Sequence, residues 1–205
     1  MLRLALALLF FPLAATAADT PDDDGFVSLF NGENLDGWTV MGEKDGFQVK
    51  DGVIHSDGET GGQWMRSEKM YGDYILKVDW RVSKDGNSGV FIRAEEEGAP
   101  WITGYEVQIS SARQDEQHCT GSLYGYVGVD PRPDESHDTW HTFTITCRGD
   151  HITVRCDDVK CIDFDQSTLE STQDKPKKGY IGLQDAHAPA GHYIQYRNIR
   201  IKPLK

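Results

Sequence analysis

Basic residues are scarce in this chain of 205 residues, which has 21 lysines and arginines against 33 aspartates and glutamates and a formal net charge of −12. A surface this acidic repels phosphate backbones and anionic lipid headgroups. We therefore expect no nucleic-acid partner and no membrane-surface partner. Acidity contributes to solubility but does not determine the fold.

Helical periodicity is also missing from the sequence. No segment of useful length repeats apolar residues every three to four positions, and residues 166–174 have room for one helical turn at most. No internal repeat, coiled coil or long linker divides the chain. We therefore expect a single all-β domain over residues 26–205, preceded by a flexible acidic lead-in at 18–25.

Several catalytic motifs are absent. The chain contains no nucleotide-binding glycine loop, no nucleophile elbow and no HExxH motif. It also lacks the closely spaced carboxylate trio that is typical of sandwich-fold glucanases. This last absence lowers the expectation of glycoside hydrolysis by a pair of carboxylates.

Cysteine is rare, with Cys119, Cys147, Cys156 and Cys161 as the four positions and no C-x-x-C pair, so we do not expect a structural zinc site. Cys156 and Cys161 flank an expected turn at Asp157-Asp158, where a disulfide across the hairpin is one alternative. Four unpaired thiols that behave as small apolar residues are the other.

The long apolar run of this chain is confined to its N-terminus. Residues 1–17 start with Met1-Leu2-Arg3, continue through an apolar run at 4–13 and end in the A-x-A cleavage site Ala15-Thr16-Ala17. The run is too short to span a bilayer. We expect a signal peptide at 1–17, a secreted or periplasmic protein, and no membrane span in the mature chain.

Alternating apolar and polar residues are the dominant pattern, and they predict strands. The alternation is clearest at 73–82 and recurs at 140–164, 179–184 and 193–201. Asp51-Gly52 predicts a type I′ hairpin, because glycine tolerates the positive φ that this turn requires. Many short strands with glycine-rich turns indicate a two-sheet antiparallel jelly-roll sandwich.

The strongest functional candidates lie on two strand-like runs at 87–94 and 104–110. Alternation along the second run separates a core face from a solvated concave face that carries Glu106 and Gln108. Arg93 is expected to pair with Glu106 if the two runs are neighbours. A structural ion pair or a solvated surface is the alternative.

Other candidates surround these runs. Asn87 and Ser88 either form a turn or present an amide and a hydroxyl to sugar hydroxyls. Trp101 and Tyr124 are candidate sugar contacts, with packing in the core or at a sheet edge as the alternative. The loop around Trp101 favours exposure.

The loop after the expected strand at 179–184 contains His187 and His192. A loop histidine can act as a general base or a metal ligand, because imidazole exchanges its proton near neutral pH. Together with Asp185 these histidines form a loose metal-like cluster. Exposed polar side chains are the alternative.

Seven segments occur in a characteristic order: FVSLFNGENLDGW (26–38), WMRSEKMYGDYILKVDW (64–80), NSGVFIR (87–93), GYEVQI (104–109), TGSLYG (120–125), GYIGLQ (179–184) and YRNIRIK (196–202). In these segments the chain resembles the 3-keto-disaccharide hydrolase domain family over about residues 25–204. The resemblance implies a concanavalin A-like jelly roll. Three segments depart from the family pattern: Trp140-His141, Cys156-Asp157-Asp158-Val159 and the extended loop at 185–193.

The resemblance also implies cleavage of a glycoside that carries a ketone at C3. Removal of the acidified C2 proton gives an enediolate, which expels the C1 substituent; water then adds in a hydrolase, or the unsaturated sugar leaves in a lyase. Glu106 or His187 would be the base. Arg93, or a divalent metal ion near His187, would stabilise the enediolate. Hydroxyls would be oriented by Gln108, Asn87 and Gln184.

Two further functions fit a carbohydrate ligand. One is a non-catalytic, lectin-like carbohydrate-binding module, because the fold alone does not determine function. The other is an ordinary glycoside hydrolase, which requires two essential carboxylates.

Overall fold

The computed structural model describes residues 24–58, 63–112 and 114–205, which form two antiparallel sheets. The strands of the larger sheet are β1 (Val27–Ser28), β3 (Gln48–Lys50), β4 (Val53–Ser56), β6 (Tyr74–Val82), β9 (His141–Arg148), β10 (His151–Cys156), β11 (Val159–Asp165) and β13 (Ile194–Pro203). Those of the smaller sheet are β2 (Trp38–Val40), β5 (Trp64–Tyr71), β7 (Asn87–Ala94), β8 (Tyr105–Ser110) and β12 (Gly179–Gln184).

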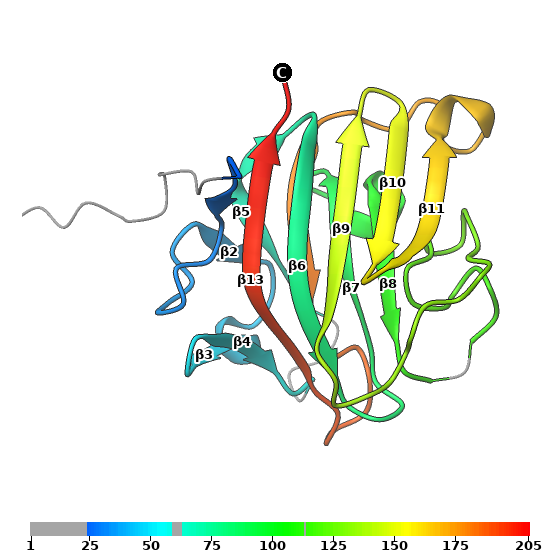
Figure 1. Cartoon of the computed structure of the whole chain (residues 1–205). Coiled ribbons are helices and arrows are strands. Elements are labelled where there is room, and N and C mark those ends of the chain that lie inside the picture. Colours follow the sequence, from blue (N-terminus) through cyan, green and yellow to red (C-terminus); the bar gives the residue numbers. More distant parts are fainter. Residues whose placement is uncertain (1–23, 59–62, 113) are drawn as a thin grey trace, which may run out of the picture.

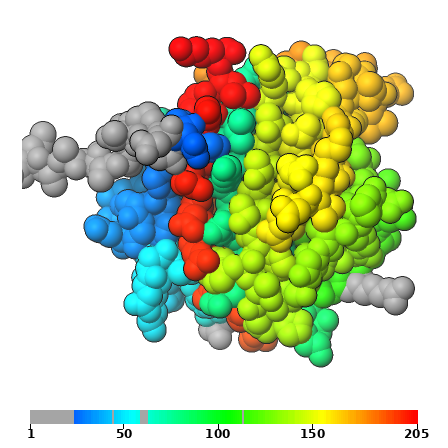
Figure 2. All heavy atoms as spheres, viewed as in Figure 1, coloured from blue at the N-terminus to red at the C-terminus, as the bar shows by residue number. Residues whose placement is uncertain are grey.

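The two sheets pack as the layers of a sandwich, with the larger sheet in front in Figure 1. The larger sheet has the order β11-β10-β9-β6-β13-β4-β3, and β1 pairs with β13 beside this path; the smaller sheet has the order β2-β5-β12-β7-β8. Figure 2 shows the face of the larger sheet, where side chains of β9 to β11 lie next to those of residues 114–140. This is the concanavalin A-like jelly-roll sandwich expected from the sequence.

Helices are few and short in the described part of the chain. They are α1 (Pro100–Thr103), η2 (Lys44–Gly46) and η3 (Gln166–Thr168), the last of which is the single turn expected at 166–174. No described helix is long and apolar enough to cross a bilayer. The expected signal peptide at 1–17 and most of the lead-in lie outside the described residues.

Strand alternation builds the core between the sheets. Along β6, every second side chain from Tyr74 to Val82 is at most 1% exposed, whereas the intervening side chains are partly exposed. The expected alternation at 73–82 is therefore confirmed. Burial of this apolar face stabilises the sandwich by roughly 25 cal/mol for each Å² removed from water.

Local turn signals are confirmed as well. Asp51 and Gly52 have φ values of 52° and 75°, and they connect the paired residues Lys50 and Val53, as a type I′ hairpin requires. Cys156 pairs with Val159 across a two-residue turn at 157–158.

All four cysteines are free and buried. The disulfide between Cys156 and Cys161, one of two alternatives from the sequence, is therefore not formed. The thiols pack as small apolar side chains, which was the other alternative.

Candidate functional site

A pocket of about 220 Å³ opens beside β8, on the face of the smaller sheet that points away from the core. Its volume lies below the range of ~300–1,000 Å³ that is usual for drug-sized ligands and suits a ligand about as large as one sugar ring. The side chains that line it are Asn87, Trp101, Glu106, Tyr124, Gln184 and His187. All six are candidates from the sequence.

Two neighbouring strands place the floor of this pocket. On β8, the side chains of Tyr105 and Val107 belong to the core, so that of Glu106 points to the opposite face. β7 pairs with β8 so that Gly89 lies opposite Gln108. Because Gly89 has no side chain, the carboxyl of Glu106 lies over it: a Cβ at this position would be 2.5 Å from Glu106 Oε1.

Glu106 is 5% exposed, and burial raises the pKa of its carboxyl to about 8. Removal from water disfavours the charged form, and no lysine, arginine or histidine of the described chain forms a salt bridge with Glu106 to offset this cost. At neutral pH the carboxyl is therefore mostly protonated, and its ionised fraction grows as the pH rises toward 8. Strongly shifted carboxyls in pockets are characteristic of functional sites.

The sequence predicted that Glu106 and Gln108 lie on a solvated face of β8, and this prediction is wrong. Glu106 and Gln108 are 5% and 2% exposed, although their strand alternates as expected. Residues 119–127 cover the free edge of β8, with hydrogen bonds from Tyr124 N to Glu106 O at 3.0 Å and from Gly121 N to Gln108 O at 2.9 Å. The same bonds hold Tyr124 beside the pocket.

Amide side chains surround the Glu106 carboxyl. Gln108 lies beneath the pocket, where its amide nitrogen donates to Asn87 Oδ1 at 2.9 Å or, with the amide turned, to Glu106 Oε1 at 3.0 Å. Gln184 is 8% exposed, and its Oε1 has no hydrogen-bond partner among the described residues. A buried acceptor at a pocket wall can take its hydrogen bond from a ligand or from a water molecule.

Trp101 lies at the rim on α1 and is 41% exposed, as its loop context predicted. Lys175 holds this loop, because its Nζ donates to Gly104 O at 2.7 Å and also to the carbonyl of Ile102. Burial lowers the pKa of Lys175 to about 8. This contact is not indicated by any sequence pattern, because Lys175 lies about 70 positions from the loop and in no recognisable motif.

His187 is exposed at the rim, where its backbone N–H donates to Asp185 O at 2.9 Å. His192 lies elsewhere, with Nδ1 3.4 Å from Ser83 Oγ. Across the described ranges, the ligand atoms of Asp185, His187 and His192 do not converge as a metal site would require. The loose metal-like cluster expected from the sequence is therefore not assembled.

Arg93 is absent from the pocket, and its expected pairing with Glu106 is wrong. The guanidinium is fully buried and donates to Gln166 Oε1 at 2.5 Å and Gly149 O at 2.8 Å. Arg93 has a positive φ of 56°, and the β12–β7 register shifts beside it. This bulge reverses the direction in which the side chain points.

The bulge at Arg93 depends on two glycines, Gly179 at the start of β12 and Gly104 just before β8. A Cβ at Gly104 would lie 2.6 Å from Arg93 C, and a Cβ at Gly179 would lie 2.3 Å from the same atom. The backbone of β7 can therefore bend here only because its neighbours have no side chain at these two positions.

Ser88 is the second candidate that the structure removes from the pocket. It is fully buried, and its Oγ lies 2.8 Å from Tyr196 Oη and donates to Gln184 O at 3.0 Å. Alternation along β7 places the side chains of Ser88 and Asn87 on different faces of the sheet. The expected contact of Ser88 with a sugar is therefore wrong.

Comparisons with known proteins agree with this fold. A curated 3-keto-disaccharide hydrolase from Bacteroides thetaiotaomicron is 23% identical over 235 aligned positions, which cover 89% of this chain and 80% of that protein. The crystal structure of a candidate glycosyl hydrolase from Parabacteroides distasonis superposes with a TM-score of 0.76 at 22% identity, covering 89% of this chain and 95% of that one. A Bacillus licheniformis β-glucanase shares the fold, with a TM-score of 0.58 at 13% identity and coverage of 86% and 96%.

The family model described as the 3-keto-alpha-glucoside-1,2-lyase-like domain matches residues 25–202. This match spans nearly the whole part of the chain that follows the expected lead-in. The chain therefore belongs to the family of 3-keto-alpha-glucoside-1,2-lyase-like domains.

Proposed function

We propose that this protein cleaves 3-keto-glycosides by removing the C2 proton beside the ketone and eliminating the C1 substituent. The observation that supports this most directly is Glu106, a buried carboxyl that lines the pocket and has its pKa raised to about 8. A desolvated carboxylate is a stronger base than one in water. It therefore suits removal of a C–H proton near neutral pH.

In the proposed reaction, ionised Glu106 takes the C2 proton, and the electron pair of that C–H bond forms an enediolate with its charge on the C3 oxygen. The enediolate then re-forms the C3 carbonyl, makes a C1=C2 double bond and breaks the bond from C1 to the leaving oxygen. That oxygen takes a proton from His187 or from water. Addition of water across C1=C2 completes hydrolysis, whereas release of the unsaturated sugar completes a lyase reaction.

The amides of the pocket would bind the sugar and the developing charge. When Asn87 Oδ1 accepts from Gln108, the Asn87 amide hydrogens are free to donate to the C3 oxygen. Gln184 Oε1 would accept from a hydroxyl, and Trp101 would cover an apolar face of the ring. This assignment gives the electrophilic role to neutral donors in place of Arg93.

An ordinary two-carboxylate mechanism is less well supported. Of the described residues that line the pocket, Glu106 is the one carboxylate, whereas retaining and inverting glycosidases place two across the scissile bond. A binding module without chemistry is the second candidate. It is favoured by the exposed Trp101 at the rim, because aromatic platforms are common in carbohydrate sites.

The experiment that tests the proposal incubates the mature protein with a 3-keto-disaccharide and with its unoxidised parent, followed by mass spectrometry. We expect consumption of the keto compound alone. The keto-sugar product of a lyase would be lighter by one water than the keto-sugar product of a hydrolase. Parallel reactions with a chelator test whether the cleavage requires a divalent ion. The exposed Glu97→Gln serves as a matched control for Glu106→Gln.

Each other outcome points elsewhere. Cleavage of the unoxidised parent would establish an ordinary glycosidase. Binding of either sugar without any product would establish a carbohydrate-binding module. Activity of Glu106→Gln equal to that of the control would remove Glu106 as the base.

A further inference from the structure

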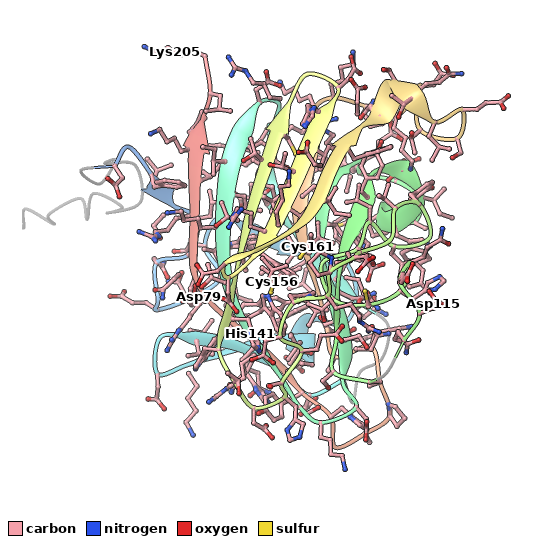
Figure 3. All side chains as sticks on the ribbon, turned by 45° about the vertical axis from the view of Figure 1, so that its right-hand side comes forward. Asp79, Asp115, His141, Cys156, Cys161 and Lys205 are labelled. Atoms are coloured by element: carbon pink, nitrogen blue, oxygen red, sulfur yellow. The ribbon has the colours of Figure 1, made fainter. Side chains whose placement is uncertain are left out.

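A second group of polar side chains lies on the larger sheet, where β9 begins and β10 ends (Figure 3). It consists of His141, Cys156 and Asp157. The imidazole Nδ1 or Nε2, the thiol Sγ and a carboxylate oxygen all lie within 4.8 Å of one another. None of these residues lines the pocket around Glu106.

The two ring nitrogens of His141 have different partners. Nε2 lies 3.0 Å from the carbonyl oxygen of Ser136, and Nδ1 lies 2.9 Å from Asp157 Oδ2. A carbonyl oxygen can only accept, so Nε2 carries a hydrogen. In neutral imidazole, Nδ1 then presents a lone pair to a carboxylate oxygen, which is favourable only if a proton or a metal ion lies between the two atoms.

The anchoring of His141 matches that of metal-binding histidines. Such residues almost always donate their second ring N–H to a carbonyl or carboxylate, which orients the ring and frees the other nitrogen as a ligand. The ring of His141 is also packed against that of Trp80, with a centroid distance of 4.7 Å, and the residue is 2% exposed. The Nδ1 position is therefore held rigidly.

Asp157 is held in place as firmly. Its Oδ1 accepts from Thr142 N at 2.8 Å, and its own backbone N–H donates to Thr142 O at 2.9 Å. These bonds point Oδ2 at His141. The Asp157 side chain is 43% exposed, which leaves a path from solvent to the group.

Cys156 differs from the other thiols of its region. Cys119 and Cys161 donate to the carbonyls of Glu116 and Val159, whereas Cys156 Sγ has no hydrogen-bond partner among the described residues. Burial raises the pKa of the Cys156 thiol, so a metal ion would be needed to hold it as a thiolate at neutral pH.

We propose that His141, Cys156 and Asp157 form a binding site for a divalent transition-metal ion, with zinc as the best fit. One nitrogen, one sulfur and one oxygen donor match the ligands that zinc takes in proteins. Zinc–ligand bonds of about 2.0–2.3 Å at tetrahedral angles place donors roughly 3.3–3.7 Å apart. His141 Nδ1 and Asp157 Oδ2, now 2.9 Å apart, would therefore separate by a few tenths of an ångström, with Cys156 Sγ already within 4.8 Å of both. On binding, Cys156 releases its proton to solvent, and the fourth position is left to water.

The site would join parts of the chain that are otherwise held by hydrogen bonds. It would connect the start of β9 to the turn between β10 and β11 and, through Ser136, to residues 134–140. We therefore expect the metal to stabilise the fold rather than to take part in cleavage of the sugar.

The test uses the mature full-length protein, treated with a chelator and shown by mass to have reduced thiols, and titrates it with Co²⁺ and then Zn²⁺. We expect one Co²⁺ per chain with a near-ultraviolet thiolate-to-cobalt band, loss of that band when Zn²⁺ displaces Co²⁺, and a higher unfolding temperature with either ion. Cys156→Ser should lose the band. Cys161→Ser, a buried thiol of the same hairpin outside the donor set, should keep it.

Two results would overturn the proposal. One is a folded protein with no thiolate-to-cobalt band and no response of its unfolding temperature to Zn²⁺, which would assign a proton to the position between His141 and Asp157. The other is a band that Cys156→Ser retains. If Cys156→Ser does not fold, His141→Asn provides the same comparison, because it removes the nitrogen ligand and preserves hydrogen-bonding capacity.

Discussion

Glu106 and Arg93 are buried ionisable side chains on neighbouring strands of one sheet, and their surroundings differ in kind. Glu106 on β8 lines a pocket and lacks a charged partner among the described residues. Arg93 on β7 is fully enclosed and donates to the oxygens of Gln166 and Gly149. The carboxyl is left available to a ligand, whereas two guanidinium nitrogens are already bound to the protein.

The difference shows how burial produces two outcomes. A buried group that donates to internal acceptors, as Arg93 does through two of its three nitrogens, contributes to the stability of the fold, because breaking those bonds leaves unsatisfied partners. A buried group that faces an open pocket instead has its pKa shifted and its bonding capacity unfilled. Mutations at the two positions should therefore separate activity from stability.

The largest expected effect is on catalysis at Glu106. Glu106→Gln removes the proposed base and keeps the size of the side chain, so turnover of a 3-keto-glycoside should fall by roughly 10²–10⁴-fold. The free energy of unfolding should change by less than about 1 kcal/mol at pH 4, where the carboxyl is protonated in both states, and at neutral pH the variant should be the more stable of the two. Steady-state kinetics measure the turnover, and urea unfolding measures the stability. Large destabilisation without loss of turnover would give Glu106 the structural role that we assign to Arg93.

The next effect is on stability at Arg93. Arg93→Met removes two charged hydrogen bonds and leaves buried acceptors on Gln166 and Gly149, so we expect a loss of about 3 kcal/mol in the free energy of unfolding. The exposed Arg155→Met is the matched control and should change stability little. A stable but inactive Arg93→Met would return Arg93 to the catalytic site.

The raised pKa of Glu106 predicts a pH dependence of stability. Below the unfolded pKa of 4.5, the carboxyl is protonated in both states; between 4.5 and about 8, only the folded state retains the proton. The stabilisation is thus fully present at low pH and lost as pH rises through this window, at up to about 1.4 kcal/mol per pH unit.

Unfolding measured from pH 4 to 9 on the wild type and on Glu106→Gln checks this prediction. The wild type should lose stability relative to the variant until about pH 8, with no further change above it. Parallel stability curves for the two proteins would show that the pocket does not raise the pKa of the Glu106 carboxyl.

The smallest expected effect comes from the glycine beneath the carboxyl. Gly89→Ala places a Cβ 2.5 Å from Glu106 Oε1 and 2.7 Å from its Cγ, so the carboxyl must move. A displacement of about 1 Å can reduce turnover ~10²-fold, and we expect a loss somewhat below this because the side chain can rotate. Gly72→Ala, which meets no atom within 4 Å, is the control in the same assay.

Much of the site could be predicted from the sequence, because its signals are local. Alternation at 104–110 assigned Glu106 to the face opposite the core, and the loop around Trp101 indicated exposure; both are confirmed. The same alternation explains why the predicted sugar contact of Ser88 is wrong, since its side chain points to the other face of the sheet from that of Asn87. Arg93 was beyond such reasoning, because one bulge reversed its direction.

The sequence by itself determined the strands and the two-residue hairpins, because side-chain alternation and turn chemistry depend on a few neighbouring residues. The family was indicated by the resemblance of seven ordered segments. Only the tertiary structure decided that Tyr124 and His187 meet Glu106 in one pocket, that Gly104 and Gly179 permit the bulge at Arg93, and that His141 faces Asp157 and Cys156. These features depend on contacts between segments far apart in the chain. The pKa of Glu106 has the same origin, because packing of distant segments is what removes its carboxyl from water.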